Sequence, residues 1–326
     1  MTTTQDVTRD GSDIDPDLRR FMAINAQAYA GHPPLDGLSL PEARKIFTAV
    51  REPWRTGGPV MVSTRDLTVE TRHGAVPVRI HDPLPGAAKP ALIYVHGGGW
   101  TIFNIDTHDR LMREYAARAG VVVIGVDYDL SPEVKFPVAL EQVIDVVGWL
   151  ETAAPELGVD PSRVAIGGDS AGGNLSLTTC LALRDQGRGE VIAAMILNYP
   201  VVDRDTGTEH ADRYGGPAYM LTNAEMEQFW VNYLADPKDA ENPLANPARA
   251  DLTGLPPVFL AIPECDLLTG QGLSIAERFE AAGVPVRAET YVGACHSFLE
   301  AVSIAPIADR ALAETSAWLA ETLAAR

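Results

Sequence analysis

The feature that most constrains this chain is a regular alternation of short apolar runs with segments of helical character. The apolar runs, rich in Val, Ile and Ala, are residues 60–70, 76–81, 91–96, 121–127, 163–167, 191–198, 258–263 and 286–292. The helical segments are residues 107–119, 138–152, 171–186, 271–282 and 308–325. Strands that alternate with helices return to the sheet in parallel, so the pattern predicts an α/β fold.

The polarity of the runs indicates how the sheet is buried. Residues 121–124 and 193–197 are apolar without period-2 alternation, which is typical of strands covered on both faces. Residues 64–70 are partly polar, and residues 72–74 have the composition of a hairpin turn, which predicts antiparallel strands at one edge. We therefore expect a mostly parallel central sheet of about eight strands flanked by helices.

Two segments fall outside the alternation. Helical patterns precede the first strand, and residues 203–250 form a long excursion with a helical stretch at 224–234. Segments of this length are seldom structureless in a compact domain and often form lids. We expect a helical cap made of residues 1–55 and the insertion 203–250, over a core made of residues 56–202 and 251–326.

Charge and cysteine content restrict the partners. Lys and Arg number 26 against 44 Asp and Glu, a net charge of −18, which repels nucleic acid and anionic membrane surfaces. Three cysteines without a CxxC pair argue against a disulfide framework or a metal knuckle. The first 15 residues are polar, and no stretch approaches the roughly 18 apolar residues of a membrane helix. We expect a cytoplasmic protein that binds a small molecule.

Ser170 is the candidate nucleophile. It lies in Gly168-Asp169-Ser170-Ala171-Gly172, the one GxSxG stretch of the sequence, between a predicted strand and a predicted helix. A strand-to-helix turn strains the serine backbone, and the flanking glycines leave room for neighbouring backbone. The serine oxygen then lies at a helix N-terminus, where the helix dipole favours developing negative charge. Asp169 is expected to be structural.

A second glycine motif, beginning at His96, follows the strand at 91–96. Consecutive glycines let backbone N–H groups approach a substrate oxygen closely, which is the chemistry of an oxyanion hole. We predict that Gly97, Gly98 and Ala171 donate these N–H groups. His96 is expected to orient the loop.

A serine nucleophile needs a base and a group that orients the base. Of seven histidines, His296 follows the last strand, where a loop reaches the carboxyl ends of the parallel strands, and we predict it as the base. Glu264 and Asp266 both follow the strand at 258–263. The spacing alone leaves both carboxylates open as the orienting acid.

These motifs together resemble the hormone-sensitive-lipase-like branch of the α/β-hydrolase fold, the family IV bacterial carboxylesterases, in the subgroup with a GDSAG elbow. The likeness runs from about residue 75 to the C-terminus. It rests on five places in the sequence: residues 96–100 (HGGGW), 127–133 (DYDLSPE), 168–174 (GDSAGGN), Asp266 ahead of Gly272, and Gly293 with His296. Where the family commonly has DPLRDEG, residues 266–272 read DLLTGQG, so the acidic pair after the acid is absent.

The resemblance implies an α/β-hydrolase fold and a triad of Ser170, Asp266 and His296, which selects Asp266 over Glu264. It implies hydrolysis of small, short-chain acyl esters through an acyl-enzyme, with no cofactor and no metal, and a homodimer built through the last strand. Two alternatives stay open: an amidase or deacetylase with the same triad, and a non-catalytic binding protein on a hydrolase scaffold.

Apolar and aromatic side chains are the candidates for substrate contact. From the predicted cap we expect contacts that limit acyl length, and from the core two aromatics beside the predicted oxyanion loop and a central strand. The six residues are Phe21, Met22, Tyr219, Met220, Trp100 and Tyr199.

Overall fold

The central element is one sheet, which the computed structural model describes within residues 10–205, 207 and 209–325. Its strands are β1 Ser63–Thr71, β2 Gly74–Asp82, β3 Lys89–Val95, β4 Val122–Val126, β5 Val159–Asp169, β6 Ala194–Asn198, β7 Val258–Cys265 and β8 Val286–Cys295. Their order in the sheet is β1-β2-β4-β3-β5-β6-β7-β8. The hairpin β1–β2 and the pair β2–β4 are antiparallel, and every other pair is parallel. The predicted α/β-hydrolase fold and the antiparallel edge are confirmed.

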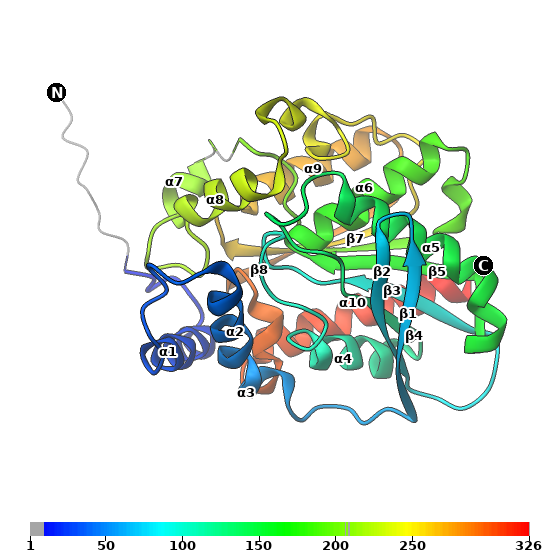
Figure 1. The fold of residues 1–326 in the computed structure, drawn as a ribbon, viewed down its shortest axis with the longest axis horizontal. Helices are drawn as coiled ribbons and strands as arrows, with labels where there is room; N and C mark the ends of the chain where they lie inside the picture. Colours follow the sequence, from blue (N-terminus) through cyan, green and yellow to red (C-terminus); the bar gives the residue numbers. More distant parts are fainter. Residues whose placement is uncertain (1–9, 206, 208, 326) are drawn as a thin grey trace.

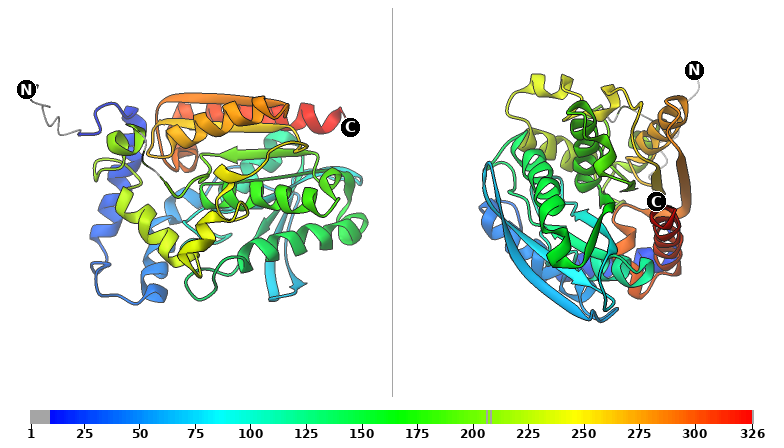
Figure 2. Two further views of the ribbon diagram at one scale, coloured as in Figure 1. Left: turned by 90° about the horizontal axis from the view of Figure 1, so that it is seen from above. Right: turned by 90° about the vertical axis from the view of Figure 1, so that its right-hand side faces the viewer.

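Helices cover both faces of this sheet (Figure 1). They are α1 Pro16–Ala30, α2 Leu40–Val50, α3 Glu52–Arg55, α4 Asp109–Ala119, α5 Val138–Leu157, α6 Ala171–Asp185, α7 Glu209–Tyr214, α8 Asn223–Tyr233, α9 Thr269–Ala281 and α10 Pro306–Ala324. Short 3-10 turns are η1 Gly189–Val191, η2 Pro237–Glu241, η3 Pro247–Arg249 and η4 Phe298–Ser303. α5, α6 and α9 pack on one face, and α4 and α10 pack on the other (Figures 1 and 2).

Several element boundaries differ from the prediction. The first strand begins at Ser63 because Val60 and Val62, included in the predicted strand, are exposed. β5 begins at Val159, four residues before the predicted start, because the sequence Asp-Pro-Ser at 160–162 does not resemble a buried apolar strand. β8 continues through Gly293 to Cys295, whereas the predicted strand ended at Val292.

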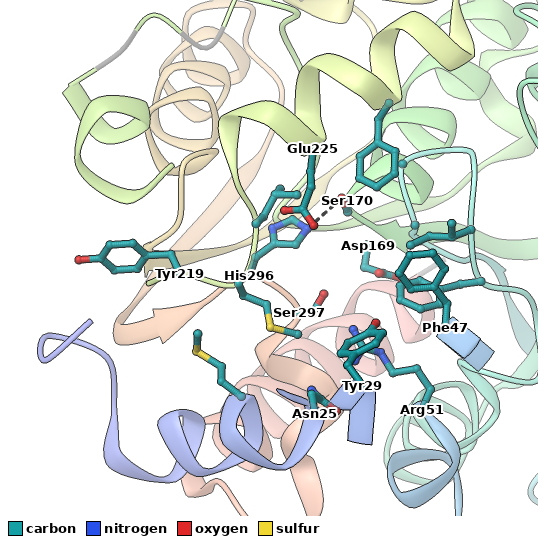
Figure 3. A pocket seen from close by; sticks show the side chains of 18 of the residues that line it. Asn25, Tyr29, Phe47, Arg51, Asp169, Ser170, Tyr219, Glu225, His296 and Ser297 are labelled. Atoms are coloured by element: carbon teal, nitrogen blue, oxygen red, sulfur yellow. Dashed lines mark hydrogen bonds between the residues drawn. The ribbon is translucent and has the colours of Figure 1, made fainter. Parts of the chain in front are cut away.

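The carboxyl ends of the parallel strands point toward α1, α2, α7 and α8, which lie together at that end of the molecule (Figures 1 and 2). Contacts between distant parts of the chain join these helices and the sheet. The Tyr219 hydroxyl donates to Asp13 Oδ1 at 3.0 Å, and the Asp15 N–H donates to the Gly293 carbonyl at 2.9 Å. The pocket described below lies at this end (Figure 3).

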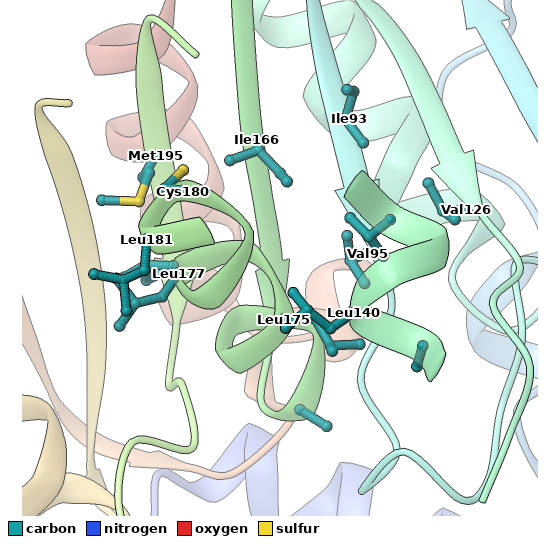
Figure 4. Close-up of a cluster of buried hydrophobic side chains, with 14 of the residues drawn as sticks. Ile93, Val95, Val126, Leu140, Ile166, Leu175, Leu177, Cys180, Leu181 and Met195 are labelled. Atoms are coloured by element: carbon teal, nitrogen blue, oxygen red, sulfur yellow. The ribbon is translucent and has the colours of Figure 1, made fainter. Parts of the chain in front are cut away.

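The core is divided by the sheet into two apolar layers. Along β3, Ile93 and Val95 face the α5–α6 side, whereas Leu92 and Tyr94 face the α4–α10 side, as the period of a strand requires. Figure 4 shows the first layer, in which Ile166 of β5 lies among side chains of α6 and β3. Burial on both faces explains why these strands lack alternation in the sequence.

We predict that Ile166→Ala lowers the free energy of unfolding by about 2–5 kcal/mol, because it removes buried methyl groups and leaves a cavity. Val60→Ala is the matched control: Val60 is 92% exposed and Ile166 is fully buried. The control should stay within about 0.5 kcal/mol of the native protein. Denaturant unfolding of the three proteins measures this, and equal losses would contradict the layer assignment.

Candidate active site

A cavity of about 390 Å³ lies between the carboxyl ends of the strands and helices α1, α2 and α8 (Figure 3). Its walls are mainly apolar and aromatic, with a few polar groups. The lining residues are Met22, Asn25, Ala26, Tyr29, Leu35, Phe47, Arg51, Gly98, Gly99, Ile102, Phe103, Asp169, Ser170, Tyr219, Met220, Leu221, Glu225, Phe229, His296 and Ser297. Such a volume with convergent polar groups is typical of a small-molecule site.

Ser170, His296 and Asp266 form a hydrogen-bonded relay at this cavity. His296 Nε2 lies 3.0 Å from Ser170 Oγ, and His296 Nδ1 lies 2.6 Å from Asp266 Oδ2. When Nδ1–H donates to the carboxylate, Nε2 is free to accept the serine proton. The candidate nucleophile, base and orienting acid are therefore in hydrogen-bond contact.

The elbow between β5 and α6 explains the position of Ser170. Its backbone has φ 53° and ψ −117°, a strained conformation for a residue with a side chain. A Cβ at Gly168 or at Gly172 would overlap the carbonyl oxygen of Val95 on β3, so the turn packs closely only with glycine there. The GxSxG spacing follows from this close approach of β3.

The structure shows which of the two candidate carboxylates, Glu264 or Asp266, contacts His296. Asp266 Oδ1 accepts the Leu268 N–H at 3.0 Å, which holds the other oxygen toward His296. Glu264 instead accepts the Gly293 N–H at 2.8 Å and so binds the neighbouring strand β8. The acid next to the histidine is Asp266.

The electrostatics of His296 favour a base that binds a proton readily. Burial of the ring lowers the pKa of His296, but the charge and hydrogen bond of Asp266 outweigh this effect and raise it above the ordinary value of 6.5. Tyr199 packs edge-on against the ring, with centroids 4.9 Å apart. The Asp266 carboxylate therefore stabilises the protonated form of this ring.

The contacts of the glycine loop contradict one of the three predicted oxyanion-hole donors, Gly97. The Gly97 N–H donates to Asp169 Oδ1 at 3.2 Å, so it is not available to a substrate. Gly98 and Gly99 line the cavity, and the hydrogen bonds of the described residues include none donated by their N–H groups or by that of Ala171. Gly99, the third glycine of the motif, lines the cavity but was not among the predicted donors.

Asp169 holds this loop to the elbow. Besides Gly97, its carboxylate accepts the Tyr94 hydroxyl at 2.8 Å and lies 3.3 Å from His108 Nε2. Burial raises the pKa of Asp169, but the charge of His108 outweighs it and the pKa is lowered. The expectation that Asp169 is structural agrees with these contacts, and the partner His108 was missed.

His96 lies where an orienting residue is needed. Its ring stacks on Tyr128 with centroids 4.3 Å apart, and Nδ1–H donates to the Gly97 carbonyl at 2.7 Å. Burial lowers the pKa of His96 to about 3, so the ring is neutral near pH 7. A neutral, stacked ring fixes the loop without competing as a base.

Three of the six predicted substrate contacts line the cavity: Met22, Tyr219 and Met220. The other three are corrections. Phe21 packs on Trp54 with centroids 4.7 Å apart, Trp100 stacks on Tyr233 at 4.1 Å, and Tyr199 packs on His296.

Helix geometry explains why Phe21 of α1 does not line the cavity. Neighbouring helix residues point about 100° apart, so Phe21 and Met22 cannot share a face. The cavity face is instead Met22, Asn25, Ala26 and Tyr29, which follow the i, i+3, i+4, i+7 spacing. Asn25 and Tyr29 were missed, although this spacing was visible in the sequence.

Two further features bear on ligands and location. Within the described part of the chain, no group of three His, Cys, Asp or Glu side chains is placed to hold a metal ion. No helix among the same residues is long and apolar enough to cross a membrane. Cys180, Cys265 and Cys295 are buried free thiols.

Comparison with known proteins gives consistent matches. The family described as the alpha/beta hydrolase fold matches residues 92–300. An ethyl acetate hydrolase of Pseudomonas putida is 35% identical over 92% of this chain and 96% of its own length. The carboxylic ester hydrolase LipN of Mycobacterium tuberculosis is 33% identical over 92% of this chain and 80% of its own. The structure of a hyperthermophilic esterase from the archaeon Pyrobaculum calidifontis aligns with a TM-score of 0.88 and 32% identity, over 94% of this chain and 98% of that one.

We predict that the His296 imidazole titrates above 6.5 and that Asp266→Asn lowers its pKa, because the charge and hydrogen bond of Asp266 are lost and only the smaller effects of Asp169 and Glu300 still oppose the burial that disfavours the cation. Proton NMR of the ring measures both midpoints, and His296→Asn identifies the resonance. An unchanged midpoint in Asp266→Asn would show that the carboxylate does not set the protonation of this ring.

Proposed function

Because this chain belongs to the hormone-sensitive-lipase-like family of α/β-hydrolase carboxylic ester hydrolases, we propose that it is a serine carboxylesterase of small, short-chain acyl esters. The observation that carries the proposal is the relay of Ser170, His296 and Asp266 at the cavity. We also assign the chain to the GDSAG subgroup, on residues 168–172.

The first half of the reaction acylates Ser170. As Ser170 Oγ attacks the ester carbonyl carbon, His296 Nε2 accepts the serine proton and Asp266 stabilises the resulting imidazolium. The carbonyl oxygen becomes an oxyanion, which the N–H groups of Gly98, Gly99 and Ala171 bind. His296 then donates the proton to the leaving alcohol as the tetrahedral intermediate collapses.

The second half releases the acid. A water molecule gives a proton to His296 Nε2 as it attacks the acyl carbon, and the same N–H groups bind the second oxyanion. Collapse of this intermediate breaks the acyl bond to Ser170 Oγ, which regains its proton from His296. Fixed backbone donors of this kind contribute about 10²- to 10³-fold each in other serine hydrolases.

The size of the cavity supports small substrates. Its volume of about 390 Å³ lies near the lower end of ligand sites, which run from about 300 to 1,000 Å³. Tyr219, Met220 and Phe229 line it and restrict long acyl chains. The ethyl acetate hydrolase relative is named for an ester of this size.

We further propose that residues 1–55 and 203–250 act as a cap over the core, of which residues 1–9, 206 and 208 lie outside the described residues. Both segments contribute to the cavity wall and contact the glycine loop. Arg44 Nε donates to the Thr101 carbonyl at 2.8 Å, and the Phe229 ring packs on Gly99 so closely that a Cβ there would overlap it.

We predict that the native protein cleaves p-nitrophenyl acetate and butyrate faster than the octanoate ester, and that Ser170→Ala lowers kcat by about 10⁶-fold. Ser162→Ala, an exposed serine in β5, is the control and should retain full activity. A chromogenic assay measures all three proteins, with a matched p-nitroanilide to test amide cleavage. Faster anilide than ester turnover would favour the amidase alternative.

The cytoplasmic location and the homodimer remain our proposals. The dimer has a structural rationale, because β8 is the last strand of the described sheet and Val292 on it is 71% exposed. We predict a dimer by light scattering in the native protein and a monomer in Val292→Lys at an unchanged melting temperature. A dimer in both proteins would show that the interface does not depend on Val292 of β8.

A further inference from the structure

One wall of the cavity is polar and buried, and the proposed mechanism does not use it. Asn25 of α1 and Arg51, between α2 and α3, are 3% and 4% exposed, and both line the cavity (Figure 3). Buried amides and guanidinium groups are normally saturated with hydrogen bonds. Their donors therefore need a partner.

The amide of Asn25 has a fixed orientation. Trp54 Nε1–H donates to Asn25 Oδ1 at 2.7 Å, which turns the NH₂ group to the other side. Asn25 Nδ2 is buried and has no partner among the described residues. Asn25 thus presents a donor without an acceptor at the cavity wall.

The guanidinium of Arg51 is held from two sides. It lies over the Phe103 ring at 4.8 Å, and its Nε is 2.7 Å from Glu300 Oε2. The side chains of this ion pair are only 5% and 6% exposed. Arg51 Nη1 is buried and, within the described residues, without a hydrogen-bond partner.

The charge of this wall restricts what it binds. Glu300 compensates the charge of Arg51, so the pair offers donors without a net positive charge. The cavity also contains Glu225, and the chain carries a net charge of −18. An anionic substrate group therefore gains little attraction from this wall and is repelled by the negative charge around it. A neutral oxygen accepts hydrogen bonds from the free N–H groups without this repulsion.

We propose that Asn25 Nδ2 and Arg51 Nη1 form a donor subsite that selects esters carrying a neutral acceptor oxygen, a carbonyl, ether or hydroxyl, in the acyl or alcohol chain. The proposal rests on the proposed esterase function, because the subsite belongs to the same cavity. It names the substrate class: oxygenated small esters rather than plain alkyl esters.

The test compares matched esters with the native protein. Alkyl esters are paired with esters in which one CH₂ is replaced by an ether oxygen or a carbonyl, at each position in turn on both sides of the ester bond. At the best position we expect kcat/KM to rise by about 10- to 100-fold, the range of a hydrogen bond to a charged donor. Half-esters with a terminal carboxylate should be poorer substrates than either.

Two variants assign the preference to these side chains. Asn25→Leu removes the amide donor, and Arg51→Lys keeps a cation beside Glu300 but loses the planar guanidinium fork. Each should reduce the ratio of oxygenated to alkyl ester turnover by at least about threefold. Trp54→Phe removes the bond that orients the Asn25 amide and should lower the ratio less than Asn25→Leu does. Ser162→Ala, an exposed serine in β5, is the control and should retain the ratio.

The outcomes separate the two proposals. Hydrolysis of alkyl esters without preference for any oxygenated partner overturns the subsite alone, and so does a preference that both variants retain. Preference for the carboxylate half-esters also overturns the proposal, because it shows that the two donors bind an anion rather than a neutral oxygen. No turnover of any ester overturns the esterase function and this inference with it.

Discussion

Close approach between the β3 carbonyl of Val95 and the elbow after β5 is the constraint on which the rest of the site depends. Glycine at 168 and 172 lets the backbone pass this oxygen, and the turn then holds Ser170 at φ 53°. A larger residue at either position would displace the serine from His296. The strained backbone of Ser170 persists because the surrounding strands and α6 are buried. The packed core holds a conformation that an isolated turn would not keep.

Asp169 extends this constraint to the oxyanion loop. Its side chain fixes Gly97, and its backbone precedes the nucleophile, so one residue sets the distance between the loop and Ser170. Despite the opposing effect of burial, the neighbouring His108 holds the pKa of the buried Asp169 carboxyl below its usual range. The proposed nucleophile and oxyanion donors are therefore placed by one rigid unit, as electrostatic preorganisation requires.

The sequence predicted the parts of this site that depend on backbone geometry. The order of strands and helices along the chain, the elbow with Ser170 and the place of His296 after the last strand follow from apolar runs and glycine spacing. What it could not predict depends on three-dimensional partners: Gly97 is occupied by Asp169, and Phe21 turns toward Trp54. Neither partner is a neighbour in sequence. The choice of Asp266 over Glu264 needed the family resemblance, because local spacing treats the two carboxylates alike.

The contacts that close the cavity join opposite ends of the chain. Asp13 and Asp15 bind Tyr219 and Gly293, and His296 comes from the last tenth of the sequence. During synthesis the N-terminal helices therefore emerge long before the residues they cover. A nascent chain that has not yet reached residue 296 carries Ser170 without the histidine that contacts its hydroxyl, so the serine stays unactivated up to that point.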